Sequence, residues 1–224
     1  MRLSSDFLAN HQLYNQKYRI ADSGGCSAMG STLLRLTGSS VLFTAPHSVT
    51  QLRAGREKLA ELWTGALAES LSTILDANVV TALSPRIERE NAATADGFRR
   101  VVDLLLRTGR IELVFDVHGL GAHHGRDIYL GSAGFFRPEL TEGLFEDLGR
   151  EFDIGVDESF NGDSGLTGYI NGDRTTKAHA LQLELGPRLR NDTTETRDLD
   201  VLAECLGRFA ELVLRGSNPP TEYS

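Results

Sequence analysis

Two histidines follow two apolar runs whose composition is typical of buried strands. His47 comes after Val41–Ala45 and a single proline, and His118 directly follows Ile111–Val117. In α/β sheets, ligands bind beyond the carboxyl ends of the strands, which is where both imidazoles would lie. Imidazole is the commonest zinc ligand, and a catalytic zinc takes three protein ligands and leaves a fourth position open. One such histidine could simply cap a strand or bond a loop, but two at equivalent strand ends favour a metal site.

A later strand carries a second polar pair. Gln182 and Glu184 lie two residues apart within Ala180–Leu185, so they point to the same face of that strand. A buried carboxylate there is costly unless it is paired, placed at the mouth of the sheet or used in catalysis. The alternative is an edge strand with one solvated face. Asp116, two residues before His118, is interpreted as a buried structural acid next to the site.

The apolar pattern of the rest of the chain predicts the elements that position these residues. Short apolar runs predict strands at Tyr18–Ala21, Thr32–Thr37, Val41–Ala45, Asn78–Leu83, Ile111–Val117, Ile128–Leu130 and Ala180–Leu185. Apolar residues three and four positions apart predict helices at Arg56–Ala77, Ala92–Thr108, Pro138–Phe152 and Leu199–Arg215. Gly109 is the expected stop of the second helix. Alternating strands and helices indicate an α/β fold with a mostly parallel sheet and helices on both faces.

Composition narrows the class of protein. The 224 residues include 40% hydrophobic and 24% charged side chains, which is typical of a globular protein, and the net charge is −8. An acidic chain argues against nucleic acid as a partner. The sequence has two cysteines and no apolar stretch long enough to span a membrane, so we expect no disulfide framework, no membrane partner and a cytoplasmic location. We expect one domain over residues 1–215 and a flexible tail over residues 216–224.

Three short motifs carry a resemblance to a known family. Ala45-Pro46-His47-Ser48, then Phe115-Asp116-Val117-His118-Gly119, then Gln182-Leu183-Glu184-Leu185 resemble the N-formylglutamate amidohydrolase family, whose members are related to zinc carboxypeptidases. The resemblance spans about residues 40 to 190. It implies a phosphorylase/hydrolase-like three-layer α/β/α fold with a mixed, mostly parallel sheet, one Zn²⁺ ion, and hydrolysis of an amide bond.

The third metal ligand is not given by the motif of the related carboxypeptidases. They take two ligands from His-x-x-Glu, whereas the third residue after His47 is Thr50. Glu57 and Glu61 are both within reach, and on the predicted helix they would stack on one face. The residue pattern does not decide which of the two is the ligand, and both could equally be solvent-exposed acids without a role in the site. The resemblance favours Glu61, because the segment Lys58–Gly65 is similar to the family's segment with its acidic ligand.

The resemblance also suggests the general base, whereas side-chain chemistry and position in the sequence suggest the substrate-binding residues. Glu184 matches the late-strand glutamate of the family and is the expected general base, which takes a proton from water and returns it to the leaving nitrogen. Five cations lie near the motifs: Arg53, Lys58, Arg99, Arg188 and Arg190. Guanidinium groups suit a substrate carboxylate, and the expected substrate-binding residues are Asn91, Arg99, Gln182 and Arg188, with Arg188 as the main anchor.

Two polar, glycine-containing segments are predicted to be loops. Gly119–Gly125 contains His123 and His124, which would be an extra metal contact or part of a mobile lip. Phe160–Gly172 contains Tyr169 and is expected to be a surface loop or a flexible lid that supplies a phenol. The complete expectation is a zinc-dependent amidohydrolase acting on a small N-acyl amino acid. The alternatives are a zinc peptidase, a poly-glutamate hydrolase, or a binding module that holds a carboxylate without turnover; the pattern does not indicate an oligomeric state.

Overall fold

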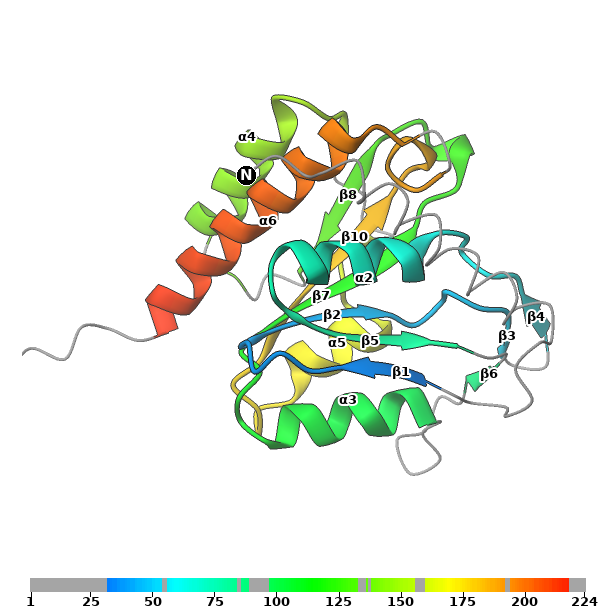
Figure 1. Ribbon diagram of the computed structural model, residues 1–224, viewed down its shortest axis with the longest axis vertical. Helices are drawn as coiled ribbons and strands as arrows, with labels where there is room; N and C mark the ends of the chain where they lie inside the picture. Colours follow the sequence, from blue (N-terminus) through cyan, green and yellow to red (C-terminus); the bar gives the residue numbers. More distant parts are fainter. Residues whose placement is uncertain are drawn as a thin grey trace, which may run out of the picture.

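The structure, a computed structural model, describes residues 32–53, 56–83, 86–88, 97–132, 136, 138–155, 160–191 and 194–217. Seven strands form a mixed sheet in the order β1-β5-β2-β7-β10-β8-β9, with helices on both faces (Figure 1). The strand bounds are β1 Thr32–Arg35, β2 Val41–Ala45, β5 Asn78–Ala82, β7 Leu113–Gly119, β8 Ile128–Gly131, β9 Ile154–Gly155 and β10 His179–Leu185. The four adjacent strands β5, β2, β7 and β10 are parallel to one another. Strand β1 is antiparallel to β5, and β8 is antiparallel to β10. The predicted three-layer α/β/α fold with a mostly parallel sheet is confirmed.

The two faces of the sheet are covered by different helices, because side chains of a strand alternate between faces. Helices α2 Thr64–Ile74, α4 Pro138–Gly149 and α6 Thr196–Ser217 cover the face that presents Phe43 and Phe115. Helices α3 Gly97–Arg107 and α5 Gly165–Gly172 cover the opposite face, which presents Leu42 and Val114. The even-numbered residues of β7 and β10, which include Asp116, His118, Gln182 and Glu184, share this second face.

Most predicted elements are present at or near the expected residues. The strand Val41–Ala45 is confirmed at both ends, and α3 is followed by Gly109, whose φ of 68° ends the helix in the left-handed conformation. Helix α6 includes Gly216 and Ser217, which were expected in the tail. The expected strand Tyr18–Ala21 and residues 218–224 lie outside the described residues. None of the described helices combines the length and hydrophobicity that a membrane span requires.

The predicted helix Arg56–Ala77 is wrong over its first eight residues. Arg56–Lys58 is strand β4, which forms a small sheet with β3 Gln51–Arg53 and β6 Arg86–Glu88. This small sheet lies beyond the carboxyl ends of β2 and β5 (Figure 1). The helix starts only at Thr64, after a turn in which Trp63 takes a left-handed φ of 73°. Glu57 and Glu61 therefore do not stack on one helix face.

The predicted loop Phe160–Gly172 is also wrong over most of its length. Gly165–Gly172 forms helix α5, because Leu166 and Ile170, four residues apart, bury their side chains against the sheet. The glycines and the asparagine of this segment lower its helix propensity, so tertiary packing decides its conformation.

Candidate metal centre

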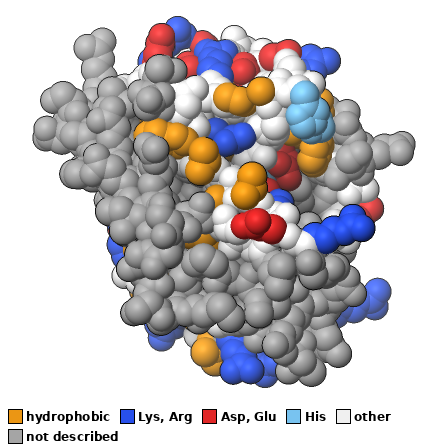
Figure 2. Space-filling model, turned by 90° about the vertical axis from the view of Figure 1, so that its right-hand side faces the viewer, with side chains coloured by type: hydrophobic (Ala, Val, Ile, Leu, Met, Phe, Trp, Pro, Cys, Tyr) orange, Lys and Arg blue, Asp and Glu red, His pale blue; other side chains and the backbone are white. Residues whose placement is uncertain are grey.

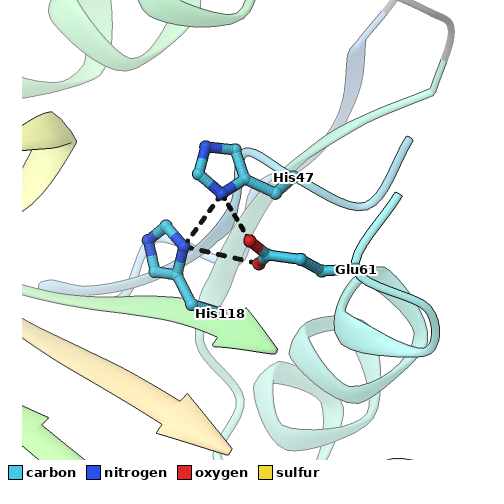
Figure 3. Close-up of side chains that lie close together, drawn as sticks. All are labelled: His47, Glu61 and His118. Atoms are coloured by element: carbon cyan, nitrogen blue, oxygen red, sulfur yellow. Dashed lines mark hydrogen bonds and ion pairs between the residues drawn. The ribbon is translucent and has the colours of Figure 1, made fainter. Parts of the chain in front are cut away.

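The structure brings His47, Glu61 and His118 together at the carboxyl ends of β2 and β7 (Figure 3). One potential ligand atom from each residue lies within 4.8 Å of the others. Nδ1 of His47 lies 3.1 Å from Nδ1 of His118 and 2.9 Å from Oε1 of Glu61. Nδ1 of His118 lies 3.5 Å from Oε2 of Glu61. The two histidines from the strand ends and the glutamate from the segment before α2 thus direct their ligand atoms to one common point.

His47 is positioned by the turn that follows β2. The hydroxyl of the next residue, Ser48, donates to the carbonyls of Ala45 and Ala82, which ties this turn to the neighbouring strand β5. Burial lowers the pKa of His47 to about 4, so its imidazole is neutral at pH 7. A neutral imidazole is the form that binds a metal.

Glu61 is positioned by three backbone contacts. Its own N–H donates to the carbonyl of His47, and its carbonyl accepts bonds from Thr64 at the start of α2. Its Oε2 accepts a hydrogen bond of 2.9 Å from the backbone N–H of Gly119, the residue after His118. Burial opposes ionisation, but hydrogen bonds from His118 and His47 outweigh it and hold the pKa of Glu61 well below its usual value. Glu61 is therefore a fixed carboxylate, the charge state a metal ligand needs.

His118 is oriented by the buried acid Asp116. Nε2 of His118 lies 3.0 Å from Oδ2 of Asp116, which leaves Nδ1 facing His47 and Glu61. The carboxylate of Asp116 also accepts bonds from the hydroxyls of Thr44 on β2 and Thr167 on α5. Carboxylates commonly orient metal-binding histidines in this way. The interpretation of Asp116 as a buried acid next to the site agrees with this geometry.

Asp116 also controls the charge of His118. Burial lowers the pKa of His118, but the carboxylates of Asp116 and Glu61 outweigh burial and raise it well above the usual 6.5. Burial likewise opposes the ionisation of Asp116, and the charge of His118 keeps the pKa of that carboxyl below its usual value. Without an ion, His118 is thus an imidazolium that lies between the carboxylates of Asp116 and Glu61.

Lys58 supplies the positive charge nearest to this cluster among the described contacts. Its ammonium donates to Oε1 of Glu61 at 2.7 Å, and its Nζ lies 2.8 Å from Nδ1 of His47. The side chain of Lys58 is one-third exposed and extends from the small sheet.

The donor set fits a zinc ion by its chemistry and its size. Two imidazole nitrogens and one carboxylate are a known ligand set of catalytic zinc, with bonds of about 2.0–2.2 Å. Bonds of that length at tetrahedral angles separate the ligand atoms by roughly 3.3 Å. The two Nδ1 atoms lie 3.1 Å apart, and they lie 2.9 and 3.5 Å from the two different oxygens of Glu61, which is close to that value. The three side chains are therefore near enough to one another to hold one ion.

Glu184 lies one strand away from His118. The two residues are register partners across the parallel pair β7–β10, and Tyr129 on β8 is the register partner of Glu184 on its other side. Gln182 donates to Oε1 of Glu184 at 2.8 Å. Burial raises the pKa of Glu184, against the opposing charge of His118. A glutamate with a raised pKa accepts and returns a proton more readily near neutral pH.

The predicted substrate anchor Arg188 is directed elsewhere. Its guanidinium forms a two-point contact with Asp198 on α6, at 2.9 and 3.0 Å, and a third bond of 2.9 Å to Asp127. It also lies over the ring of Phe152. Carboxylates of the chain itself thus already occupy the guanidinium, and the expected role of Arg188 in binding a substrate carboxylate stays a prediction.

The other predicted positions have varied outcomes. Arg99 on α3 lies with its guanidinium 3.2 Å from the ring centre of Tyr169 on α5, so both side chains contribute to the packing between these helices. Glu57 is exposed on β4 and is not part of the cluster. Asn91 lies outside the described residues, and so does the side chain of Arg53.

The loop Gly119–Gly125 contains a short 3-10 turn, Ala122–His124. The rings of His123 and His124 pack against each other, and His124 also contacts Phe160. Neither histidine belongs to the cluster of His47, Glu61 and His118. Figure 2 shows the end of the molecule to which the parallel strands point, where acidic, basic, histidine and hydrophobic side chains gather.

Sequence reasoning gave no particular role to Lys58 or Arg190. Both were noted as cations near the motifs, but their spacing does not indicate their contacts. Lys58 contacts His47 and Glu61, and Arg190 donates to the backbone carbonyls of Leu62, Leu120 and Leu185. Their positions depend on the small sheet and on the turn after β10, neither of which has an apolar pattern. Only the resemblance over Lys58–Gly65 pointed toward this region.

The solved structures with the same fold include the following three proteins. An N-formylglutamate amidohydrolase from Ralstonia eutropha JMP134 matches with a TM-score of 0.58 and 15% identity, over 84% of this chain and 99% of that one. A bacteriophage poly-gamma-glutamate hydrolase matches with a TM-score of 0.53 and 12% identity, over 84% and 90%. A gene product of Agrobacterium tumefaciens matches with a TM-score of 0.52 and 13% identity, over 84% and 96%.

These matches establish the fold of the chain. No protein-family model matches the sequence, and no curated protein matches it either. The similarity is therefore one of three-dimensional arrangement, extending over nearly the whole length of each of these three proteins.

Proposed function

We propose that this chain is a zinc-dependent amidohydrolase that cleaves the amide bond of a small N-acyl amino acid. The observation that carries the proposal is the convergence of His47, Glu61 and His118 at the carboxyl ends of β2 and β7, with Glu184 one strand away. The fold shared with an N-formylglutamate amidohydrolase supports the reaction class, and the name of that protein suggests the type of substrate.

The proposed site has residues that bind the metal ion and a residue that transfers a proton. His47, His118 and Glu61 would hold the ion, and Asp116 would keep Nδ1 of His118 directed at it. A zinc ion in this position supplies Lewis acidity, which polarises the amide carbonyl and makes water acidic enough to ionise near neutral pH.

Glu184 is the proton carrier of the proposed reaction. Its carboxylate takes a proton from the attacking water and delivers it to the amide nitrogen as the carbon–nitrogen bond breaks, so that the leaving group departs as a neutral amine. The hydrogen bond from Gln182 fixes Oε1, which leaves Oε2 for this transfer. The roles of Gln182, Arg99, Arg188 and Asn91 in substrate binding remain predictions.

A second candidate is hydrolysis of poly-γ-glutamate or of a peptide. The fold match to the phage poly-gamma-glutamate hydrolase favours the first of these. The two substrates differ in size, so an assay separates them directly. A module that binds a carboxylate without turnover is the third possibility.

The test uses purified protein stripped with a chelator and then reloaded with zinc. We expect about one zinc per chain, and hydrolysis of N-formyl or N-acetyl amino acids that disappears on stripping and returns on reloading. His47→Ala, prepared in parallel, controls for contaminating hydrolases. Cleavage of poly-γ-glutamate in preference to the small substrates would select the second candidate, and no bound zinc after reloading would select the binding module.

A further inference from the structure

Arg190 is bonded to the ends of three segments that carry the candidate site. Its Nε donates to the carbonyl of Leu185 at 2.7 Å, its Nη1 to that of Leu62 at 2.9 Å and its Nη2 to that of Leu120 at 2.5 Å. Leu185 follows Glu184, Leu62 follows Glu61, and Leu120 lies two residues after His118. One guanidinium therefore contacts the backbone beside the proposed base and beside two of the three proposed ligands.

The same side chain packs against the backbone between these segments. A Cβ atom built on Gly119 would lie 3.0 Å from Cζ of Arg190 and 3.0 Å from Cβ of Glu61. Gly119 thus allows the guanidinium, the end of β7 and the Glu61 segment to approach one another closely. Its N–H is also the donor to Oε2 of Glu61.

This arrangement is unusual for a partly buried arginine. Such a charge is normally paired with a carboxylate, whereas the hydrogen bonds described for Arg190 all go to carbonyls. Burial lowers the pKa of Arg190, against the opposing charges of Glu61 and Glu184. The energetic cost of burying the charge is thus offset by three fixed dipoles and by two acids of the site at longer range.

We propose that Arg190 is a positioning residue of the metal centre, which holds the Glu61 turn, the end of β7 and the end of β10 in one geometry. The role depends on the planar fork of the guanidinium, which donates in three directions at once, and a lysine ammonium at the end of a flexible chain does not reproduce it. This inference deepens the proposed function and rests on it.

Arg188 provides a matched control. It lies two residues earlier, in the 3-10 turn Pro187–Leu189, and is also an arginine with three strong bonds. Its partners are the carboxylates of Asp198 and Asp127, not the segments that carry the site. Loss of either arginine removes one charge and at least three hydrogen bonds, but only loss of Arg190 releases the ends of β7 and β10.

The experiment compares Arg190→Ala, Arg190→Lys and Arg188→Ala by zinc affinity, steady-state kinetics and melting temperature. We expect both Arg190 variants to bind zinc about 10–100-fold more weakly, the range seen when residues that orient metal ligands are removed. In zinc-saturated protein, kcat should fall more than KM rises. Millimolar guanidinium ion should restore part of the zinc affinity of Arg190→Ala, whereas Arg188→Ala should keep zinc affinity within about twofold of the parent.

Three results would overturn the inference. Parent-like zinc affinity in Arg190→Ala would remove the positioning role, and an equal loss in Arg188→Ala would mean general destabilisation. A rise in KM alone would make Arg190 a substrate contact instead. If the parent itself binds no zinc, the proposed function fails, and Arg190 is then tested in the metal-free protein by hydrogen exchange: Arg190→Ala, unlike Arg188→Ala, should raise exchange in residues 59–63 and 119–121, and unchanged exchange would refute the role.

Discussion

The backbone N–H of Glu61 donates a hydrogen bond to the backbone carbonyl of His47 across 2.8 Å. This bond joins the turn that follows β2 to the segment that precedes α2, and it fixes the distance between the two side chains before any ion is considered. The Glu61 carboxylate is then directed toward His118 by the N–H of Gly119. The proposed third ligand thus comes from a turn held by tertiary contacts, rather than from the face of a helix.

Replacement of Glu61 by Gln should abolish zinc retention. The amide keeps the shape of the side chain but removes the charge that binds the metal and accepts the bonds from Gly119 and Lys58. Glu57→Gln is the matched control, because Glu57 is exposed on β4 and outside the cluster. Zinc content after dialysis against a weak chelator measures the effect. Retention by Glu61→Gln together with loss by Glu57→Gln would reassign the ligand.

Asp116→Asn should weaken zinc binding by about 10–100-fold without unfolding the protein. The amide is nearly isosteric, but it offers His118 a neutral partner and no longer stabilises the orientation of the ring. The measurement is zinc affinity by competition with a chromophoric chelator, with circular dichroism to verify the fold. Unchanged affinity would show that Asp116 serves only the interior of the sheet.

Lys58→Met should bind zinc more tightly than the parent. An ion bonded to both His47 and Glu61 at about 2.0–2.2 Å would lie within about 4 Å of the ammonium, so Lys58 must withdraw and break its bond to Glu61. A charge-assisted bond of about 1.5 kcal/mol corresponds to roughly tenfold in affinity. Arg56→Met, at an exposed position of the same strand, controls for net charge. Weaker binding in Lys58→Met would mean that the lysine supports the site instead.

Zinc affinity should increase with pH across the neutral range. The pKa of His118 lies well above 6.5 in the metal-free protein, so an ion that binds its Nδ1 must first displace a proton. Below that pKa, this group alone makes affinity rise by up to about tenfold per pH unit, and above it the dependence ends. His47, with a pKa of about 4, contributes no proton. Calorimetry in buffers of different ionisation enthalpy counts the protons released, and a value of zero at neutral pH would contradict this assignment.

Glu184→Gln should keep zinc and lose turnover. The substitution preserves shape and hydrogen bonding but removes the base, so kcat should fall by roughly 10²–10⁴-fold with KM changed far less. Zinc content and kcat are measured on one preparation. Near-normal turnover would exclude Glu184 from the mechanism, and loss of zinc would make it a ligand.

The sheet could be predicted because its central strands are buried on both faces. Every residue of Val41–Ala45 and Asn78–Ala82 is buried, and the short runs of apolar and β-branched residues in these segments are enough to predict strands. The small sheet has no such pattern, because β4 is the polar tripeptide Arg56-Glu57-Lys58 and its conformation depends on pairing with β3. Helix α5 was missed because its glycines indicate a loop and only its packing makes it helical.

The candidate site was predictable to the extent that it follows the sheet. His47 and His118 lie at strand ends, and Glu184 lies within a strand, so the positions of the strands are enough to place them. Glu61 could be preferred only through resemblance, because its place depends on contacts with His47 and Gly119. Tertiary contacts also explain why the partners of Arg188 could not be predicted. Its position just after β10 in the sequence does not reveal that its side chain bonds to Asp198.

The adjacency of β2, β7 and β10 has a consequence for the order of folding. His47 and His118 are 71 residues apart, and their side chains meet only when β2 and β7 have paired in parallel. Parallel pairing of distant segments is slow to form, since loop-closure entropy is lost before the contacts are gained. An unfolded chain has no local cluster of these ligands that could gather an ion and nucleate the sheet. Bound zinc should therefore lengthen the lifetime of the native state by slowing unfolding, while leaving the rate of refolding almost unchanged.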